Sequence, residues 1–482
     1  MKGIKSVHIK HFLIGLMLLA VFLSSFSSLF KTVSAYPSRF DYVSVIKEID
    51  MERIKKHIET FTSFGSRFTG YPGCELAAKY IHDEFIKLGL TNVSYEYFNV
   101  AVPYDYGANI TVLKTGEVIP AYPLLPNSVE TCAISPEGIE GRLIYVKDGD
   151  LENYKEKIKG NIILMDFDSR DRWLYAAQFG AKAVIFIEKE ITQAEASRKI
   201  VGVPLDFPRL YVTEEAAQKL LRLLKEGPIY INVKSLMVYK NLKAKNVVGY
   251  ILGSDEHLKN EIVVIAAYYD STSIVPSISP GAEETCGIAA LLELARYYSY
   301  NPPKRTIMFL ALAGHHQGLA GAREFTYKHL NELGSKIKIF INLDLSTRSN
   351  ILGVYYWGLF YAYEKPIGRF LSIKNLLFKR ILPEIESQLK KDYNVIDVFI
   401  QDPANIASIA LEGFMLDSEP FTLAGGVGIS FYTSKIFHLF LNTPFDTLEK
   451  LNFSNLLPQI EFIFCSLLTF TQDEELTFPE TS

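Results

Sequence analysis

The sequence contains little cysteine and tryptophan, and it has no surplus of positive charge. Its 482 residues include four Cys and two Trp, and 50 Lys and Arg residues stand against 54 Asp and Glu residues, a formal net charge of -4. Proteins that bind nucleic acid hold its phosphates with a basic surplus, so nucleic acid is excluded as an expected partner. The cysteines are too few and too widely spaced for a disulfide framework, although export would allow some of them to pair. They are Cys74, Cys132, Cys286 and Cys465.

Low-complexity tracts and short repeats are also absent, and only one apolar run, near the N-terminus, reaches membrane-spanning length. Hydrophobic residues make up 48% of the chain and charged residues 22%, a composition that excludes disorder as the main state. At roughly 150 residues per domain, the length predicts two or three domains, each able to bury a core.

The N-terminal segment, residues 1–35, predicts export. Three lysines precede an unbroken apolar run over residues 12–23, and the small residues 33–35 follow a Ser-rich stretch. This pattern is typical of a secretory signal that is cleaved after Ala35. The alternative is a retained membrane anchor, because residues 12–30 are long enough to cross a bilayer. Both alternatives predict an extracellular or cell-surface protein. Removal of the segment takes away four Lys and leaves 46 basic against 54 acidic residues, a net charge of -8.

Alternating helix and strand signals divide the rest of the chain. Residues 36–104 include a helical stretch, CELAAKYIHDEFIKLGL. Residues 105–240 hold the strand-like runs GRLIYVKD, GNIILMDF and KAVIFIEK between the helical stretches RDRWLYAAQFGA and EEAAQKLLRLLKEG, which predicts a compact α/β module. Residues 241–472 alternate EIVVIAAYY, RTIMFLALA, KIFINLDL and VGISFYT with helical stretches such as GIAALLELARYYS. This alternation predicts a doubly wound α/β domain with a buried, mainly parallel sheet.

Polar side chains follow three of these apolar runs. Tyr268 and Asp270 end the first, His315 and His316 follow the second, and Asp344 ends the third. Ligands of open α/β sheets bind outside the carboxyl ends of the strands, so we expect these side chains to share one crevice. A metal hydrolase needs at least three His, Asp or Glu ligands and a separate base. The candidates are Asp270, Glu283, Glu284, His315, His316 and Asp344.

Two features limit the metal interpretation of these residues. Adjacent residues that leave a strand point in opposite directions, so at most one of His315 and His316 is expected to face a metal. An Asp at a strand end also often caps the next helix, and paired His residues often lie in polar loops. The residue types alone therefore leave both interpretations open.

Eight stretches of the chain resemble, in order, the landmarks of metallopeptidase family 28, the family of co-catalytic zinc aminopeptidases that also includes glutamate carboxypeptidase II. They are FGSRFTGYPGCELAAKYI, NVVGYILGS, EIVVIAAYYDS, PGAEETCGIAALLELAR, FLALAGHHQGLAGAREF, INLDLS, DSEPFTLAGGVGISFYT and NTPFDT. The middle block resembles the protease-associated domain that several members carry. The resemblance implies one peptidase-like domain, residues 36–104 and 241–472, interrupted by a protease-associated domain at residues 105–240.

The resemblance also implies where a metal site would lie, and this chain departs from the family there. Active relatives have His-x-Asp after the first strand, where this chain has Tyr268-Tyr269-Asp270. A bridging Asp of the family corresponds to Glu283 or Glu284, and counting back from Gly287 favours Glu283.

Two further family positions are replaced and one is kept. The family's Glu-Glu pair, a general base followed by a zinc ligand, is His315-His316 here. Asp344 matches the next ligand without change, but the last ligand, a His, is replaced by Asn442. Neither a phenol nor an amide is a good zinc ligand, so we expect any metal to be held weakly. If these positions hold no metal, we expect a packed Tyr268 whose hydroxyl donates to Asp270, and an Asn442 that forms a turn.

The resemblance and the replaced positions lead to three hypotheses for the function. The leading hypothesis is a peptide- or protein-binding relative that lacks the two-zinc aminopeptidase reaction and holds no cofactor. The alternative is a metal-dependent exopeptidase for extracellular peptides with one weakly bound divalent metal, zinc above all, on Glu283, His316 and Asp344. In that case His315 would be the base and Asp270 would orient the site. The third is a structural partner in a surface assembly. A thiol nucleophile at Cys286 is less expected than a small buried Cys, because no cysteine-hydrolase signature surrounds it.

Overall fold

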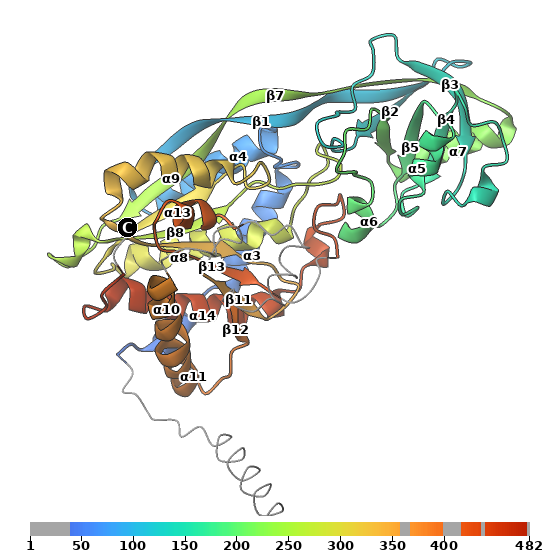
Figure 1. Cartoon of the computed structure of the whole chain (residues 1–482). Helices are drawn as coiled ribbons and strands as arrows, with labels where there is room; N and C mark the ends of the chain where they lie inside the picture. Colours follow the sequence, from blue (N-terminus) through green and yellow to red (C-terminus); the bar gives the residue numbers. More distant parts are fainter. Residues whose placement is uncertain (1–38, 357–366, 399–415, 435–438, 480–482) are drawn as a thin grey trace, which may run out of the picture.

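The computed structural model describes residues 39–356, 367–398, 416–434 and 439–479. The predicted signal at residues 1–35 and the predicted membrane attachment at residues 12–30 lie outside this part of the chain. The described residues form a larger and a smaller lobe joined by two long strands (Figure 1).

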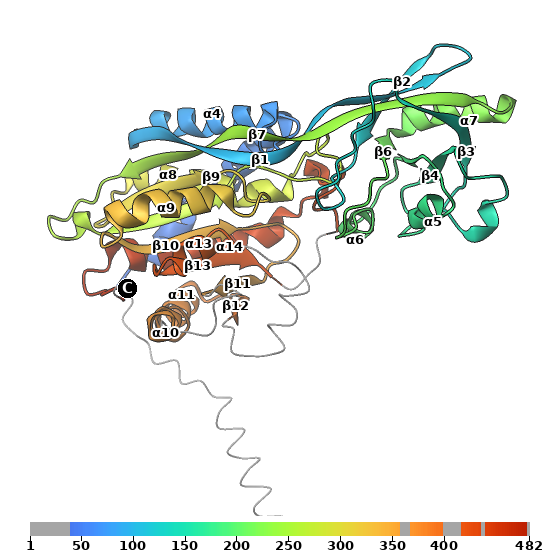
Figure 2. The same ribbon diagram turned by 45° about the horizontal axis from the view of Figure 1, so that its top comes forward.

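One sheet runs through both lobes, in the strand order β1-β2-β6-β5-β4-β3-β7-β9-β8-β10-β13-β11-β12. Its longest strands, β1 (Thr91–Val112) and β7 (Tyr230–Ile251), have 22 residues each and pair antiparallel from Thr91↔Tyr250 to Val112↔Ile231. Figure 2 shows the pair passing from the larger lobe into the smaller one. The expected domain boundaries at 104/105 and 240/241 fall inside these strands, so sheet, instead of a linker, joins the lobes.

The centre of the larger lobe is a buried parallel sheet, as predicted. Strands β8, β9, β10 and β13 pair parallel in the order β9-β8-β10-β13, and nearly all of their residues are buried because helices cover both faces. The strands of this lobe beyond β7 are β8 (Ile262–Tyr268), β9 (Thr306–Leu312), β10 (Ile337–Asp344), β11 (Leu352–Tyr355), β12 (Val395–Val398) and β13 (Gly428–Thr433).

Helices pack against both faces of this sheet, which makes the lobe doubly wound. One face buries α8 (Cys286–Tyr300) together with apolar residues of the N-terminal, α10–α11 and C-terminal helices. The other face packs against α9 (Ala320–Leu333) and α13 (Glu419–Leu423). The remaining helices are α2 (Tyr42–Lys47), α3 (Met51–Ser63), α4 (Pro72–Lys87), α10 (Ile367–Asn375), α11 (Leu382–Leu389) and α14 (Phe453–Gln472).

The smaller lobe is a second α/β layer with its own apolar clusters on the two faces of its strands. Strands β3, β4, β5 and β6 pair parallel in that order, and β2 pairs antiparallel with β6. The three strand-like runs and two helical stretches predicted here are confirmed as β3, β4, β5, α5 and α7. The elements are β2 (Val118–Pro123), β3 (Ile139–Tyr145), β4 (Ile162–Asp166), β5 (Ala183–Ile187), β6 (Arg209–Val212), α5 (Trp173–Gln178), α6 (Gln193–Ser197) and α7 (Glu214–Glu226).

Local sequence sets the ends of the predicted helices. The Thr213 side chain accepts a hydrogen bond from the backbone N–H of Ala216 at the start of α7, and α7 ends at Gly227 with φ +148°. Helix α4 begins with Pro72 and is followed by Gly89 with φ +76°.

One helix corrects the expectation that no later apolar run reaches membrane-spanning length. Helix α14 has 20 residues and a mean hydropathy of 1.3, so its length and composition alone would allow it to cross a bilayer. In the structure 72% of this stretch is buried inside the larger lobe, as in the core helix of a globular domain.

The loop after β8 connects the two lobes beside the carboxyl ends of the strands. Ile274 and Val275 of this loop are buried in an apolar cluster of the smaller lobe. The Leu125 N–H donates to the Ile274 carbonyl at 2.9 Å, and the Ile274 N–H donates to the Asn442 carbonyl at 2.8 Å. The smaller lobe therefore closes over one side of the expected crevice. The four cysteines are all buried, and none forms a disulfide.

Candidate functional site

The polar side chains predicted to share a crevice meet at the carboxyl ends of β8, β9 and β10. Tyr268 is the last residue of β8, and its ring stacks on that of His315 with 4.0 Å between ring centroids and 16° between planes. Its hydroxyl donates to Asp344 Oδ1 at 3.4 Å. The expected bond from Tyr268 to Asp270 is not formed, because β10 lies directly beside β8 and places Asp344 within reach.

His315 forms a buried ion pair with Asp417, a residue that the sequence did not single out. The His315 Nδ1 donates to Asp417 Oδ2 at 2.8 Å, and both side chains are almost fully buried. Burial opposes a charge on His315, but Asp417, Asp344 and Asp270 outweigh it and raise the pKa of His315 to about 9. His315 is therefore an imidazolium at neutral pH. The signal for Asp417 in the sequence was its place three residues before Pro420 in the stretch DSEPFT.

His316 points to a different partner, in agreement with the expectation that adjacent residues diverge. Its Nε2 lies 2.6 Å from Glu284 Oε1. The backbone N–H of Thr272 donates to both oxygens of Glu284, at 3.2 and 3.1 Å. Glycine is required at position 281, where φ is +54°, because a Cβ would lie 2.4 Å from Glu284 Oε2.

Glu283 lies apart from this group, although counting from Gly287 favoured it over Glu284. Its carboxylate accepts hydrogen bonds from the Thr347 backbone N–H at 2.6 Å and the Thr347 hydroxyl at 2.8 Å. Residues 283–285 form a turn of 3₁₀-helix, in which neighbouring side chains point about 120° apart. Glu284 therefore faces His316, and Glu283 faces Thr347.

Asp270 and Asn442 complete the set of predicted residues. Asp270 is fully buried and accepts a hydrogen bond from the Thr69 hydroxyl at 2.7 Å, and burial raises the pKa of its carboxyl. Asn442 has φ +61° and accepts the Ile274 N–H on its carbonyl, so it forms a turn, as expected. The Asp270 Oδ1 and Asn442 Oδ1 atoms are buried and have no partner among the described residues.

Arg67 holds the loop that surrounds these residues, and the sequence did not indicate this role. It is fully buried and donates to the carbonyl oxygens of Tyr269 at 3.1 Å, Pro280 at 2.7 Å and Gly281 at 2.8 Å. The guanidinium thus ties the start of the loop to its end, which fixes Gly281 and the Thr272 N–H against Glu284.

The donor set does not fit the two-zinc centre of the family. Zinc is held by three or four deprotonated ligands at one point, and among the described residues no three His, Cys, Asp or Glu side chains are arranged to hold a metal. The Nδ1 of His315 is already engaged by its hydrogen bond to Asp417. Burial raises the pKa of the Tyr268 phenol well above its usual range, so this group also stays protonated.

Cys286 does not offer a nucleophile in place of a metal. Its side chain is fully buried at the start of α8, and burial raises the pKa of its thiol well above the usual range. A reactive cysteine needs its thiolate form. Cys286 is therefore a small packed residue, as the sequence predicted.

Comparison with known sequences places the chain among peptidases. Residues 246–456 match the profile of peptidase family M28. The "Glutamate carboxypeptidase 2 homolog" of Caenorhabditis elegans is 24% identical over 372 residues, which cover 68% of this chain and 45% of that protein. "Aminopeptidase YwaD" of Bacillus subtilis is 27% identical over 209 residues, which cover 43% of this chain and 40% of that protein. The matches thus span less than half the length of these two curated relatives.

Solved structures share the fold. BSAP, a zinc aminopeptidase from Bacillus subtilis, matches with a TM-score of 0.56 at 19% identity and covers 89% of this chain and 98% of its own. The aminopeptidase from Aneurinibacillus sp. strain AM-1 matches with a TM-score of 0.52 at 19% identity and covers 92% of this chain and all of its own, 100%. The profile match assigns residues 246–456 to peptidase family M28, and the order of the eight landmarks and the mixed α/β fold with a large central sheet agree with this assignment.

Proposed function

We propose that the chain is an exported, peptide-binding member of peptidase family M28 that does not carry out the two-zinc aminopeptidase reaction. One observation carries this proposal: side chains at the family's metal positions are paired with one another or with the neighbouring Asp417. His315 pairs with Asp417, Tyr268 with Asp344, and His316 with Glu284. Breaking one buried ion pair costs roughly 3–5 kcal/mol, and metal binding would have to offset that loss.

Unpaired acceptors in the same region support binding of a peptide. Asp270 Oδ1, Asp417 Oδ1 and Asn442 Oδ1 are buried without a partner among the described residues. Buried acceptors are normally satisfied, so a ligand that supplies N–H donors would remove an unfavourable desolvation term. Peptides supply such donors along the backbone. The smaller lobe, which we infer to be a protease-associated domain, would close over the bound chain.

A metal and activity measurement tests the proposal. The full chain is purified without chelator, loaded with zinc, manganese or cobalt, and desalted. We expect less than about a tenth of an equivalent of retained metal and no release of amino acids from short peptides, because the paired side chains hold metal weakly. Inductively coupled plasma mass spectrometry and amino acid analysis give the two readouts.

The opposite result would establish the alternative, a metal-dependent exopeptidase. It consists of chelator-sensitive release of free amino acids that is lost in His316→Ala and in Asp344→Ala. His257→Ala is the matched control, because His257 is an exposed histidine outside the crevice. Its activity should equal that of the parent chain in either case.

Export is tested separately by secretion from an expression host and N-terminal sequencing. A mature protein that begins at Tyr36 would confirm the cleaved signal. A chain that keeps residues 12–30 and sediments with membranes would establish the retained anchor.

A further inference from the structure

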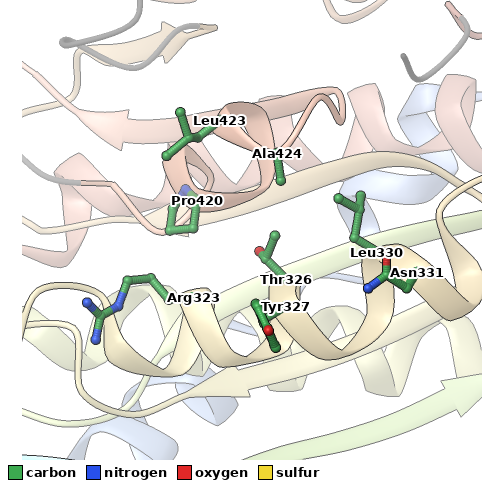
Figure 3. A pocket seen from close by; sticks show the side chains of 8 residues that line it. All are labelled: Arg323, Thr326, Tyr327, Leu330, Asn331, Pro420, Leu423 and Ala424. Carbon is green, nitrogen blue, oxygen red and sulfur yellow. The ribbon is translucent and has the colours of Figure 1, made fainter.

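A groove lies between helices α9 and α13 on the face of the larger lobe opposite α8. Its volume is about 350 Å³, at the lower end of the range of roughly 300–1,000 Å³ that is typical of small-ligand sites. Figure 3 shows α9 along one side, with Arg323 at one end and Asn331 at the other, and α13 along the facing side with Pro420 and Leu423. None of the lining residues belongs to the crevice described above.

The walls of the groove are apolar and open to solvent. Tyr327 is 83% exposed and Leu423 is 53% exposed, and Leu330 and Pro420 line the same space. Large apolar side chains that line an open groove favour a ligand with an apolar part, because contact with it removes both surfaces from water.

The polar groups of the groove include the donors Arg323 and Thr326, and no acid is among the described residues that line it. The backbone N–H of Arg323 donates to the Leu319 carbonyl at 2.9 Å, but its guanidinium forms no ion pair or hydrogen bond with a residue that the structure describes. Thr326, 5% exposed, extends from α9 towards α13 in Figure 3, and its buried hydroxyl has no partner within the described residues. Arg323 and Thr326 are about one helical turn apart on α9. A guanidinium and a free hydroxyl can each bind a carboxylate, which can accept two parallel N–H bonds from arginine.

We propose that this groove binds the C-terminal end of a short peptide whose last residues are apolar, with the terminal carboxylate at Arg323 and Thr326. Arg323 and Leu330 are seven residues apart in α9, which places them about 10 Å apart along the helix axis at 1.5 Å per residue. An extended peptide spans that distance with about three residues. The carboxylate therefore reaches Arg323 while the apolar side chains contact Leu330 and Leu423.

The site goes beyond the proposed function, because it is separate from the crevice and needs no metal. Both helices begin close to the His315–Asp417 pair: α9 starts five residues after His315, and α13 starts two residues after Asp417. A peptide end in the groove would contact the outer surfaces of both helices.

Two probes that differ only in charge test the proposal on the full chain. They are N-acetyl-leucyl-leucine and its C-terminal amide, titrated by calorimetry and by ligand-observed NMR. We expect the acid to bind with a Kd of about 1 mM or tighter. The amide should bind at least about tenfold more weakly, because it lacks the charge-assisted hydrogen bonds to Arg323.

Three variants separate the contributions of the groove. Arg323→Gln should remove the preference for the acid, and Leu423→Ser should weaken both probes by the same factor. Arg222→Gln, at an exposed arginine in α7 of the smaller lobe, is the matched control and should change neither affinity. Asp344→Ala, in the crevice, should leave the preference for the acid over the amide unchanged, so loss of the proposed crevice function would not mimic loss of this site.

Several outcomes would overturn the proposal. Equal affinities for acid and amide, an unchanged preference in Arg323→Gln, or no binding of either probe up to about 10 mM would each exclude a carboxylate site here. A monomer–dimer equilibrium in light scattering that shifts to monomer in Leu423→Ser would instead assign the groove to contact with a second copy of the chain.

Discussion

Both lobes place an ion pair beside the carboxyl ends of parallel strands, but only the pair in the larger lobe is buried. In the larger lobe, Asp417 is 1% exposed and pairs with His315 across the crevice. In the smaller lobe, Asp168 follows β4 and pairs with Lys189 after β5 at 2.7 Å, but the two side chains are 41% and 55% exposed. Both lobes thus form an ion pair beside strand ends. Burial decides how much each pair contributes to stability, because a buried charge that loses its partner is far more costly than an exposed one.

The largest expected effect comes from removing one acid in each lobe. Asp417→Ala leaves His315 buried without its counter-ion, and we expect a loss of about 3–5 kcal/mol in the free energy of unfolding. Asp168→Ala breaks a solvated pair and should cost less than about 1 kcal/mol. Urea unfolding, with the hydrogen exchange of each lobe as the probe, measures the loss of stability in both variants.

A double variant distinguishes the buried charge from simple loss of packing. His315→Phe with Asp417→Leu removes both charges and should regain most of the stability that Asp417→Ala loses, because no unpaired charge remains. If the double variant is as unstable as the single one, the pair is not the source of the loss.

A second test uses pH, because residues 105–240 contain no histidine whereas the larger lobe buries several. His57 lies against the Tyr80 hydroxyl at 2.7 Å, and burial lowers its pKa to about 4. A lowered pKa means that the unfolded chain binds the proton first. The stability of the larger lobe should therefore fall as pH drops from about 6.5 to 4, by up to about 3 kcal/mol from this residue.

His315 has the opposite dependence, because its pKa is raised. Its contribution is complete below pH 6.5 and is lost as pH rises through about 9. Hydrogen exchange measured between pH 4 and 9 should show that the larger lobe loses stability at both ends of this range, and His57→Gln should remove only the loss at low pH. If the stability of both lobes changed equally with pH, the changes could not be attributed to these histidines.

The smallest expected effect compares two glycines in the left-handed region. Gly281, beside Glu284, has φ +54°, and Gly160, in the smaller lobe, has φ +82° with nothing within 4 Å of an added Cβ. Alanine at either position should cost about 1–2 kcal/mol for the backbone conformation. Gly281→Ala should lose roughly 1–3 kcal/mol more, because its Cβ would meet Ser271 and Glu284 at 2.4 Å. Equal losses in thermal unfolding would show that the loop around Glu284 adapts freely.

Much of the fold could be predicted from the sequence, since apolar runs and helical spacing are local signals. The strands β8, β9, β10 and β13 and the helices α4, α7 and α8 appear where those signals lie. The long strands β1 and β7 were not predicted, because their stability comes from pairing with each other over residues far apart in the chain. The alternation of exposed and buried residues in β1 is also irregular.

The sequence by itself indicated the resemblance to peptidase family M28, the buried parallel sheet and the polar side chains at the strand ends, since these depend on residue identity and order. Only the tertiary structure decided how those side chains are used. It brought Asp417 to His315, turned Glu284 instead of Glu283 towards His316, and placed Asp344 beside Tyr268. The physical reason is that a pair of charges or hydrogen-bonding groups is chosen by distance and burial, and both are set by how strands, turns and loops from separate parts of the chain pack together.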